Sequence, residues 1–195
     1  MNKLFTLGFL IIIGSFSFAQ TIKDTLHYYS LEEAISLNND EVFAIDLSKR
    51  KLESVPEELK NFKHLKGLNL NRNRLTTLPE FFKDFTALEF LYLHRNKLID
   101  ISEEITSLSN LLWLDISRNN ITKITASIGN LKKLRYLDAW DNLFEEIDLA
   151  FTELKQLEVI DFRGNTYATS FVKKWIEAFP NTKVYFDKPC NCLDH

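Results

Sequence analysis

The chain has 195 residues, of which 45% are hydrophobic, and its 24 basic and 27 acidic side chains give a net charge of −3. This length fits one domain, and the hydrophobic fraction is sufficient to bury a core. The mildly acidic balance argues against nucleic acid as a partner, because phosphate neutralisation requires clustered Lys and Arg.

The N-terminus has the parts of a secretory signal. Lys3 precedes an apolar run over residues 4–18, and Ser17 and Ala19 are the small residues expected at a cleavage site. The run is shorter than the ~20 apolar residues of a membrane anchor, and no cysteine follows the cleavage point to receive a lipid. We therefore predict a signal peptide over 1–19, a secreted or periplasmic bacterial protein, and no membrane insertion after cleavage.

Residues 20–41 are predicted to form an N-terminal cap. Ser30 and Glu33 have the spacing of a capping box, which favours a short helix from there to about Leu37. The apolar side of this helix is expected to consist of Leu31, Ala34 and Ile35.

Over residues 42–180 the chain repeats six times. The pattern L-x-x-L-x-L-x-x-N-x-L recurs every 23 residues, with starts at 42, 65, 88, 111, 134 and 157. We number its positions 1 to 11. Side chains alternate along a strand with a period of two, so the apolar positions 1, 4, 6 and 11 are predicted to face one core. The second half of each repeat has apolar residues three to four apart, which favours short 3₁₀ or helical turns.

Position 9 is an asparagine in five of the repeats, and Arg50 replaces it in the first. An amide both donates and accepts hydrogen bonds, so it can satisfy backbone groups where each strand bends into its turn. We predict a ladder of buried amides formed by Asn73, Asn96, Asn119, Asn142 and Asn165.

The C-terminal residues are predicted to cap the other end. A helix is expected over 169–179, and a last strand and a tail over 181–195. The inward side chains of the helix are expected to be Phe171, Val172, Trp175, Ile176 and Phe179.

The tail contains Cys190 and Cys192. Export places them in an oxidising environment, but a bridge between them would close a very small, strained ring. A disulfide-linked dimer through Cys190 or Cys192, or a labile redox pair, is the alternative. Together with His195 they supply three ligands, fewer than the four of a structural zinc site, so no metal is expected.

These repeats resemble the 23-residue class of leucine-rich repeat proteins, in a short secreted bacterial form, and the resemblance covers residues 42–165. It implies an α/β solenoid: a horseshoe with a parallel concave sheet, convex 3₁₀ or helical turns, and helical N- and C-terminal caps. It also implies a scaffold for protein interaction.

No catalytic motif is found. The sequence has no phosphate-binding glycine loop, no G-x-S-x-G and no H-E-x-x-H. Ser117, His94 and Asp115 would lie close together on neighbouring strands, but on an open surface without an oxyanion hole. We therefore expect no enzymatic activity and no cofactor.

Aromatic and acidic side chains gather at the outward positions 3, 5 and 7 of repeats three to five. An exposed aromatic patch rimmed by carboxylates suits recognition of a partner, although rings on adjacent strands can also simply pack on each other. The predicted ligand-binding residues are Phe90, Tyr92, His94, Trp113, Asp115, Tyr136, Asp138 and Trp140.

The prediction is a non-enzymatic, secreted scaffold that binds an unidentified protein or peptide on the concave face. A carbohydrate or peptide-fragment binder on the same patch is one alternative, and a structural component linked through the C-terminal cysteines is another. The basic column Lys49, Arg72, Arg95 and Arg118 is interpreted as a solvated, ion-paired edge in preference to an anion site.

Overall fold

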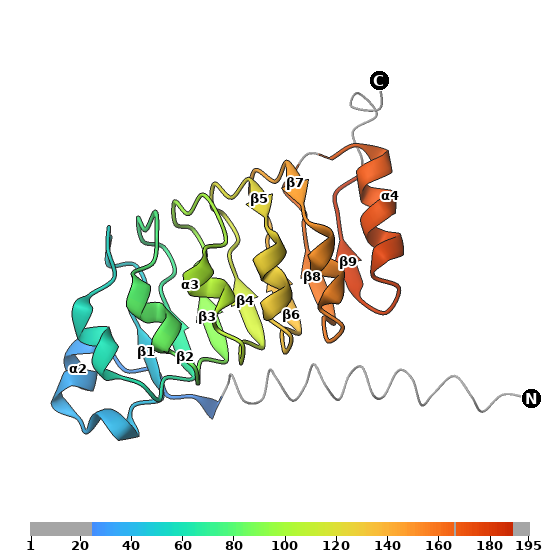
Figure 1. Cartoon of the computed structure of the whole chain (residues 1–195). Coiled ribbons are helices and arrows are strands. Elements are labelled where there is room, and N and C mark those ends of the chain that lie inside the picture. The colour runs from blue at the N-terminus through green and yellow to red at the C-terminus, as the bar shows by residue number, and fades with distance from the viewer. Residues whose placement is uncertain (1–24, 166, 189–195) are drawn as a thin grey trace, which may run out of the picture.

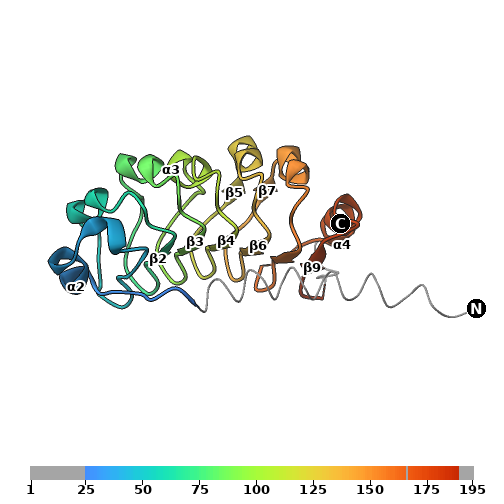
Figure 2. The same ribbon diagram turned by 90° about the horizontal axis from the view of Figure 1, so that it is seen from below.

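A computed structural model describes residues 25–165 and 167–188. The chain is an α/β solenoid in which a parallel sheet lines one side and short helical turns line the other (Figures 1 and 2). In order across the sheet, the strands are β1 (Ala44–Asp46), β2 (Gly67–Asn69), β3 (Phe90–Tyr92), β4 (Trp113–Asp115), β6 (Tyr136–Asp138), β8 (Val159–Asp161) and β9 (Lys183–Tyr185). The predicted leucine-rich repeat architecture is confirmed.

Neighbouring strands pair with residues at the same repeat position opposite each other. Ala44 lies opposite Gly67, and Gly67 opposite Phe90. The offset is 23 residues until the last pair, where Val159 lies opposite Lys183, so that repeat is one residue longer. Each outward position of the repeat therefore forms a straight column across the sheet.

The convex side consists of one turn of helix per repeat. Figure 2 shows these turns in a row on the side away from the sheet. They are η2 (Glu57–Asn61), η3 (Glu80–Asp84), α3 (Glu103–Thr106), η4 (Ala126–Asn130) and η5 (Leu149–Glu153), and all but α3 are 3₁₀. A small second sheet of β5 (Lys123–Ile124) and β7 (Glu146–Ile147) precedes the last two turns, and this sheet was not predicted.

The core is one continuous stack of the apolar positions. Ala139 is fully buried where the preceding repeats have Leu or Ile, and the large ring of Phe162 lies one repeat further on. Phe162 contacts the rings of Phe144 and Phe151, with centroids 5.7 and 6.0 Å apart. A large side chain one repeat from a small one is the arrangement that keeps a core densely packed.

The N-terminal cap contains α2 (Leu31–Ser36) and a 3₁₀ turn, η1 (Asn39–Glu41). The capping box is present: the Ser30 hydroxyl accepts from the Glu33 amide, and the Glu33 carboxylate accepts from the Ser30 amide. Leu31 and Ala34 are buried, but Ile35 is 56% exposed. The expectation for Ile35 was wrong, because only one narrow side of this short helix touches the first repeat.

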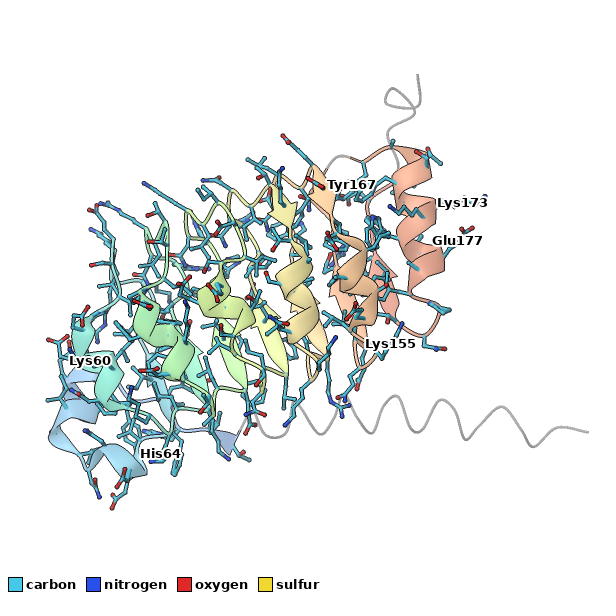
Figure 3. All side chains as sticks on the ribbon, viewed as in Figure 1. Lys60, His64, Lys155, Tyr167, Lys173 and Glu177 are labelled. Carbon is cyan, nitrogen blue, oxygen red and sulfur yellow. The ribbon has the colours of Figure 1, made fainter. Side chains whose placement is uncertain are left out.

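The C-terminal cap is α4 (Thr169–Ala178), which packs across the last repeat. Val172 and Trp175 are buried in it, whereas Ile176 is 50% exposed, contrary to expectation. Lys173 and Glu177 project from its outer side (Figure 3). Ile176 lies between that outer side and the buried one, beyond the arc that the repeat covers.

Five asparagines at position 9 tie each repeat to the one before it. The Asn119 amide nitrogen donates to the carbonyls of Leu93 and Ile116, at 3.0 and 2.9 Å, and its oxygen accepts from the Leu98 amide at 3.0 Å. Asn73, Asn96 and Asn142 make the same kind of bonds one repeat away. Each side chain thus satisfies backbone groups of two repeats at once.

Arg50 takes a different role at the equivalent place in the first repeat. Its guanidinium forms a two-point ion pair with Glu32 of α2, so it fastens the cap to the stack. Its backbone amide is satisfied by Asn73 of the next repeat, at 3.1 Å.

Within the described residues, no helix is long and apolar enough to cross a membrane.

The ladder predicts a matched pair of variants. Asn119→Ala should lower the free energy of unfolding by about 2–3 kcal/mol, because buried backbone groups of two repeats lose their partner. Asn120→Ala, at the exposed neighbouring position, should change it by less than about 0.5 kcal/mol. Urea unfolding followed by circular dichroism measures both, and equal effects would contradict the role assigned to the ladder.

Candidate functional site

The concave face presents positions 3, 5 and 7 of every repeat. Because the register holds from strand to strand, side chains at one position lie next to each other in a row. The site is therefore built from short rows of side chains on an open sheet.

One wall of the site comes from the segment before the first helix. Tyr29 pairs with β1: its amide donates to the Ala44 carbonyl at 3.0 Å, and its carbonyl accepts from the Asp46 amide at 2.8 Å. This pairing extends the sheet and places Tyr28 and Leu26 over the concave face. A methyl group added at Gly67 would lie 2.5 Å from the Tyr28 hydroxyl and 3.2 Å from a Leu26 methyl, so Gly67 leaves the space that they occupy.

This covering corrects the predicted aromatic patch. Phe90 is fully buried and Tyr92 is 8% exposed, so neither ring is on an exposed surface as predicted. Phe90 lies opposite Gly67 in the sheet, directly beyond the place that Tyr28 and Leu26 fill. The sequence shows an outward position for Phe90, but it does not show that another segment fills the space at the neighbouring Gly67.

The opposite wall is a pair of stacked rings. Trp113 of β4 and Tyr136 of β6 lie opposite each other, with centroids 3.7 Å apart and planes inclined by 15°. Both side chains are half-buried. Trp140 lies outside this pair, where the Arg118 guanidinium covers its ring at 4.4 Å. The rings do pack on each other, but the stack remains partly open to solvent.

Between the two walls lies a hollow of 460 Å³ on the concave face. It is lined by Tyr28, Asp46, Asn69, Asn71, Tyr92, Trp113, Asp115 and Asp138. Four of the predicted residues are in this lining, namely Tyr92, Trp113, Asp115 and Asp138. Tyr136 is stacked behind Trp113. Neither His94 nor Trp140 lines the hollow. Phe90 is buried.

Four lining residues were not predicted: Tyr28, Asp46, Asn69 and Asn71. The small residues Ala44 and Gly67 at position 3 are the sequence signal that could have indicated a covering segment. No sequence pattern identifies Tyr28 as the residue that fills that space.

The position-5 side chains have a structural task in the strand. The Asp115 carboxylate accepts from the Ser117 amide at 3.0 Å, and the Asp138 carboxylate from the Trp140 amide at 3.1 Å. Asn69 makes the same bond through its amide oxygen, to the Asn71 amide at 3.1 Å. An uncharged side chain is therefore sufficient for this turn, and the negative charge of the aspartates is not needed for it.

The charges at position 5 repel each other. Burial, followed by the nearby charge of Asp115, raises the pKa of Asp138 to about 6. Asp161, the next carboxylate in the row, is neutralised by a two-point ion pair with Arg163. Burial and the charge of Asp138 also raise the pKa of Tyr136 to about 12. The row is thus electrostatically strained at Asp138.

Family models named leucine rich repeat match the chain over residues 42–98 and again over 110–131. The chain is a leucine-rich repeat protein. Among curated proteins, none matches its sequence significantly.

Two solved structures share the fold of this leucine-rich repeat protein. A leucine-rich repeat protein of Leptospira interrogans and internalin C2 of Listeria monocytogenes each superpose with a TM-score of 0.63, are 23% identical, and are matched over 75% of this chain. The match spans 43% of the first protein and 62% of the second. At this identity the likeness shows the fold alone.

The leucine-rich repeat protein does bring Ser117, His94 and Asp115 together, but in the wrong order for nucleophilic catalysis. The Ser117 hydroxyl donates to Asp115 at 2.5 Å, and His94 Nδ1 lies 2.8 Å from the same hydroxyl. Since the serine proton is directed to the carboxylate, the histidine nitrogen must donate and cannot act as its base. Burial also lowers the pKa of His94. The trio is a hydrogen-bonded brace between β3 and β4.

Among the described residues, no group of three His, Cys, Asp or Glu side chains could hold a metal ion. The candidate ligands Cys190, Cys192 and His195 lie outside the described residues.

The basic column coincides with a strained backbone position of the repeat. Lys49, Arg72, Arg95 and Arg118 all have positive φ, between 53° and 60°, where the chain leaves each strand. Within the described residues, Arg118 is the one member with an ion pair, to Asp141 at 3.3 Å. The ion-paired edge expected from the sequence is therefore formed at this one repeat.

The covering of the sheet by Tyr28 predicts a double-mutant cycle. Gly67→Val should cost about 1–3 kcal/mol of unfolding free energy in the wild type, because the new side chain displaces Tyr28. In a Tyr28→Ala background the same substitution should cost at least about 0.5 kcal/mol less. Denaturant unfolding of the four proteins measures the coupling, and strictly additive effects would show that the two residues do not compete for this space.

The strained carboxylate predicts a pH-dependent gain in stability. The folded-state pKa of Asp138, about 6, is above the ordinary 3.8, so its favourable contribution to folding is complete below pH 3.8 and is lost as the pH rises through 6. Asp138→Asn should therefore stabilise the protein at pH 7.5 by about 1 kcal/mol, allowing for solvent screening, and should have little effect near pH 3.5. Unfolding measured at both pH values checks this, and an equal effect at both would refute the electrostatic cause.

Proposed function

We propose that this leucine-rich repeat protein is an exported, non-enzymatic scaffold that binds a protein segment in the hollow of its concave face. Solenoids of this kind use their extended concave surface for binding. The wall of the proposed site is the Trp113–Tyr136 stack in repeats four and five, and the floor extends back to Asp46 and Asn69 in the first two repeats.

The observation on which the proposal rests is the combination of an aromatic wall and polar floor in one hollow. Aromatic anchors next to hydrogen-bonding groups are typical of the energetic centres of protein interfaces. The chain covers the neighbouring rings Phe90 and Tyr92 with its own residues, yet leaves Trp113 and Tyr136 half-buried. This difference supports a role for the stack beyond packing.

Export is part of the proposal. Residues 1–19 have the features of a cleaved signal, which would place the mature chain outside the cytoplasm or in a periplasm. These residues lie outside the described part of the chain. Intact-mass analysis of the protein recovered from its native source would show a mature chain beginning at Gln20.

A carbohydrate ligand is the second candidate for the same hollow. Sugars also pack against aromatic rings, and Tyr136 occupies one face of Trp113, with ring centroids 3.7 Å apart. The floor runs from Asp46 in the first repeat to Asp138 in the fifth, which favours an extended protein segment. Linkage through Cys190 or Cys192 is compatible with either ligand, and a non-reducing gel of the mature chain tests it.

The proposal predicts the effect of removing the stack. Peptides selected from a random display library on the wild-type protein should bind a Trp113→Ala/Tyr136→Ala variant at least about tenfold more weakly, since aromatic anchors typically contribute 2 kcal/mol or more. Leu149→Ala/Ile176→Ala, which removes two exposed apolar side chains away from the concave face, is the matched control. Circular dichroism verifies that both variants fold. Selected peptides that bind all three proteins equally would refute the site.

A further inference from the structure

We infer that the hollow receives the guanidinium group of an arginine side chain from the bound protein segment, between Trp113 and the carboxylates of Asp115 and Asp138. This inference rests on the proposed function and specifies the chemistry of the partner. Four features of the described residues support it.

The first feature is a charge that the fold does not need. Asn69 makes the position-5 hydrogen bond without a charge, so an asparagine could do the same at Asp115 and Asp138. The carboxylates instead stand beside each other across the β4–β6 pair, where each opposes the ionisation of the other. A cation bound between them would remove this repulsion.

The second feature is the same arrangement completed elsewhere in the chain. One repeat further on, the Asp161 carboxylate is held by the Arg163 guanidinium in a two-point ion pair, and that guanidinium lies 5.3 Å from the Tyr185 ring on the next strand. Arg118 likewise lies over Trp140 and pairs with Asp141. A carboxylate, an aromatic ring and a guanidinium therefore occur together twice on this edge of the sheet.

The third feature is an arginine that Asp161 has and Asp138 does not. Arg163 is at position 7 of its repeat, and the corresponding residue beside Asp138 is Trp140. In the part of the chain that the structure describes, Asp46 and Asp138 form no ion pair. Asp138 therefore lies beside other carboxylates of position 5, as Asp161 does, but its repeat supplies no arginine to pair with it.

The fourth feature is room and shape. The hollow of 460 Å³ lies within the ~300–1,000 Å³ range of pockets that hold small ligands, and so admits a whole side chain. A planar guanidinium can bind a carboxylate at two points while it contacts an aromatic face, which a lysine ammonium cannot do. The arrangement therefore favours Arg over Lys.

The test uses peptides selected from a random display library on the full wild-type protein. These peptides should be enriched in arginine. Replacing the critical arginine by citrulline, which keeps the shape but removes the charge, should weaken binding at least about tenfold, and replacement by Lys should have a smaller effect.

The matched protein variant is Asp115→Asn/Asp138→Asn, which keeps both position-5 hydrogen bonds. It should weaken binding of the arginine peptide at least about tenfold while leaving the fold at least as stable as the wild type. The control is Asp84→Asn/Asp148→Asn, which makes the same change in charge. Asp84 pairs with the exposed Lys63, and Asp148 caps η5 with the type of bond an asparagine also makes. This control should bind the peptide as the wild type does.

The outcomes separate the two proposals. If peptides depend on Trp113 and Tyr136 but show no arginine enrichment, or bind the Asp115→Asn/Asp138→Asn variant normally, the arginine inference is wrong and the proposed function stands. If no selected peptide depends on Trp113 and Tyr136, the proposed function itself fails, and the inference fails with it.

Discussion

Everything on the concave face depends on the buried amide at position 9 of the repeat. Each asparagine bonds backbone groups of its own repeat and of the repeat before it, as Asn119 does with Leu93, Ile116 and Leu98. A buried carbonyl or amide without such a partner would cost about 1–3 kcal/mol, so a shift of one repeat against another is strongly disfavoured. The register that results places equivalent outward positions side by side, and only then can residues 23 apart in sequence act together.

That register explains why position 5 can have two roles. Within a strand, its side-chain oxygen holds the amide two residues on, which an asparagine does as well as an aspartate. Across strands, the same column brings carboxylates next to each other. At Asp138 burial and this repulsion raise the pKa, whereas at Asp161 the ion pair with Arg163 neutralises the charge. Repelling charges that the turn does not need, kept side by side in a hollow, support the proposed binding of a cation, since strain of this kind tends to gather at functional sites.

The N-terminal segment decides how much of the concave face is available. By pairing with β1 through Tyr29, it directs Tyr28 and Leu26 onto the sheet at Gly67, beside the buried Phe90, and turns an open surface into a hollow with two walls. The proposed partner would therefore enter beside Tyr28 and contact repeats four and five, away from the covered end. The cap that protects the core also limits the binding surface.

The sequence by itself determined the solenoid, its register and the amide ladder, because a strict period leaves one way to stack identical units. Local signals, the capping box at Ser30 and the apolar side of the last helix, indicated both caps. It also indicated Tyr92, Trp113, Asp115 and Asp138 as outward-facing residues, since alternation along a strand is a local property. Only the tertiary structure decided that Phe90 is buried, that Tyr28 forms a wall, and that Ile35 and Ile176 are exposed. These outcomes depend on contacts between the repeats and segments outside them. Gly67 and Tyr28, which fills the space beside it, are far apart in the chain, and no sequence pattern links them.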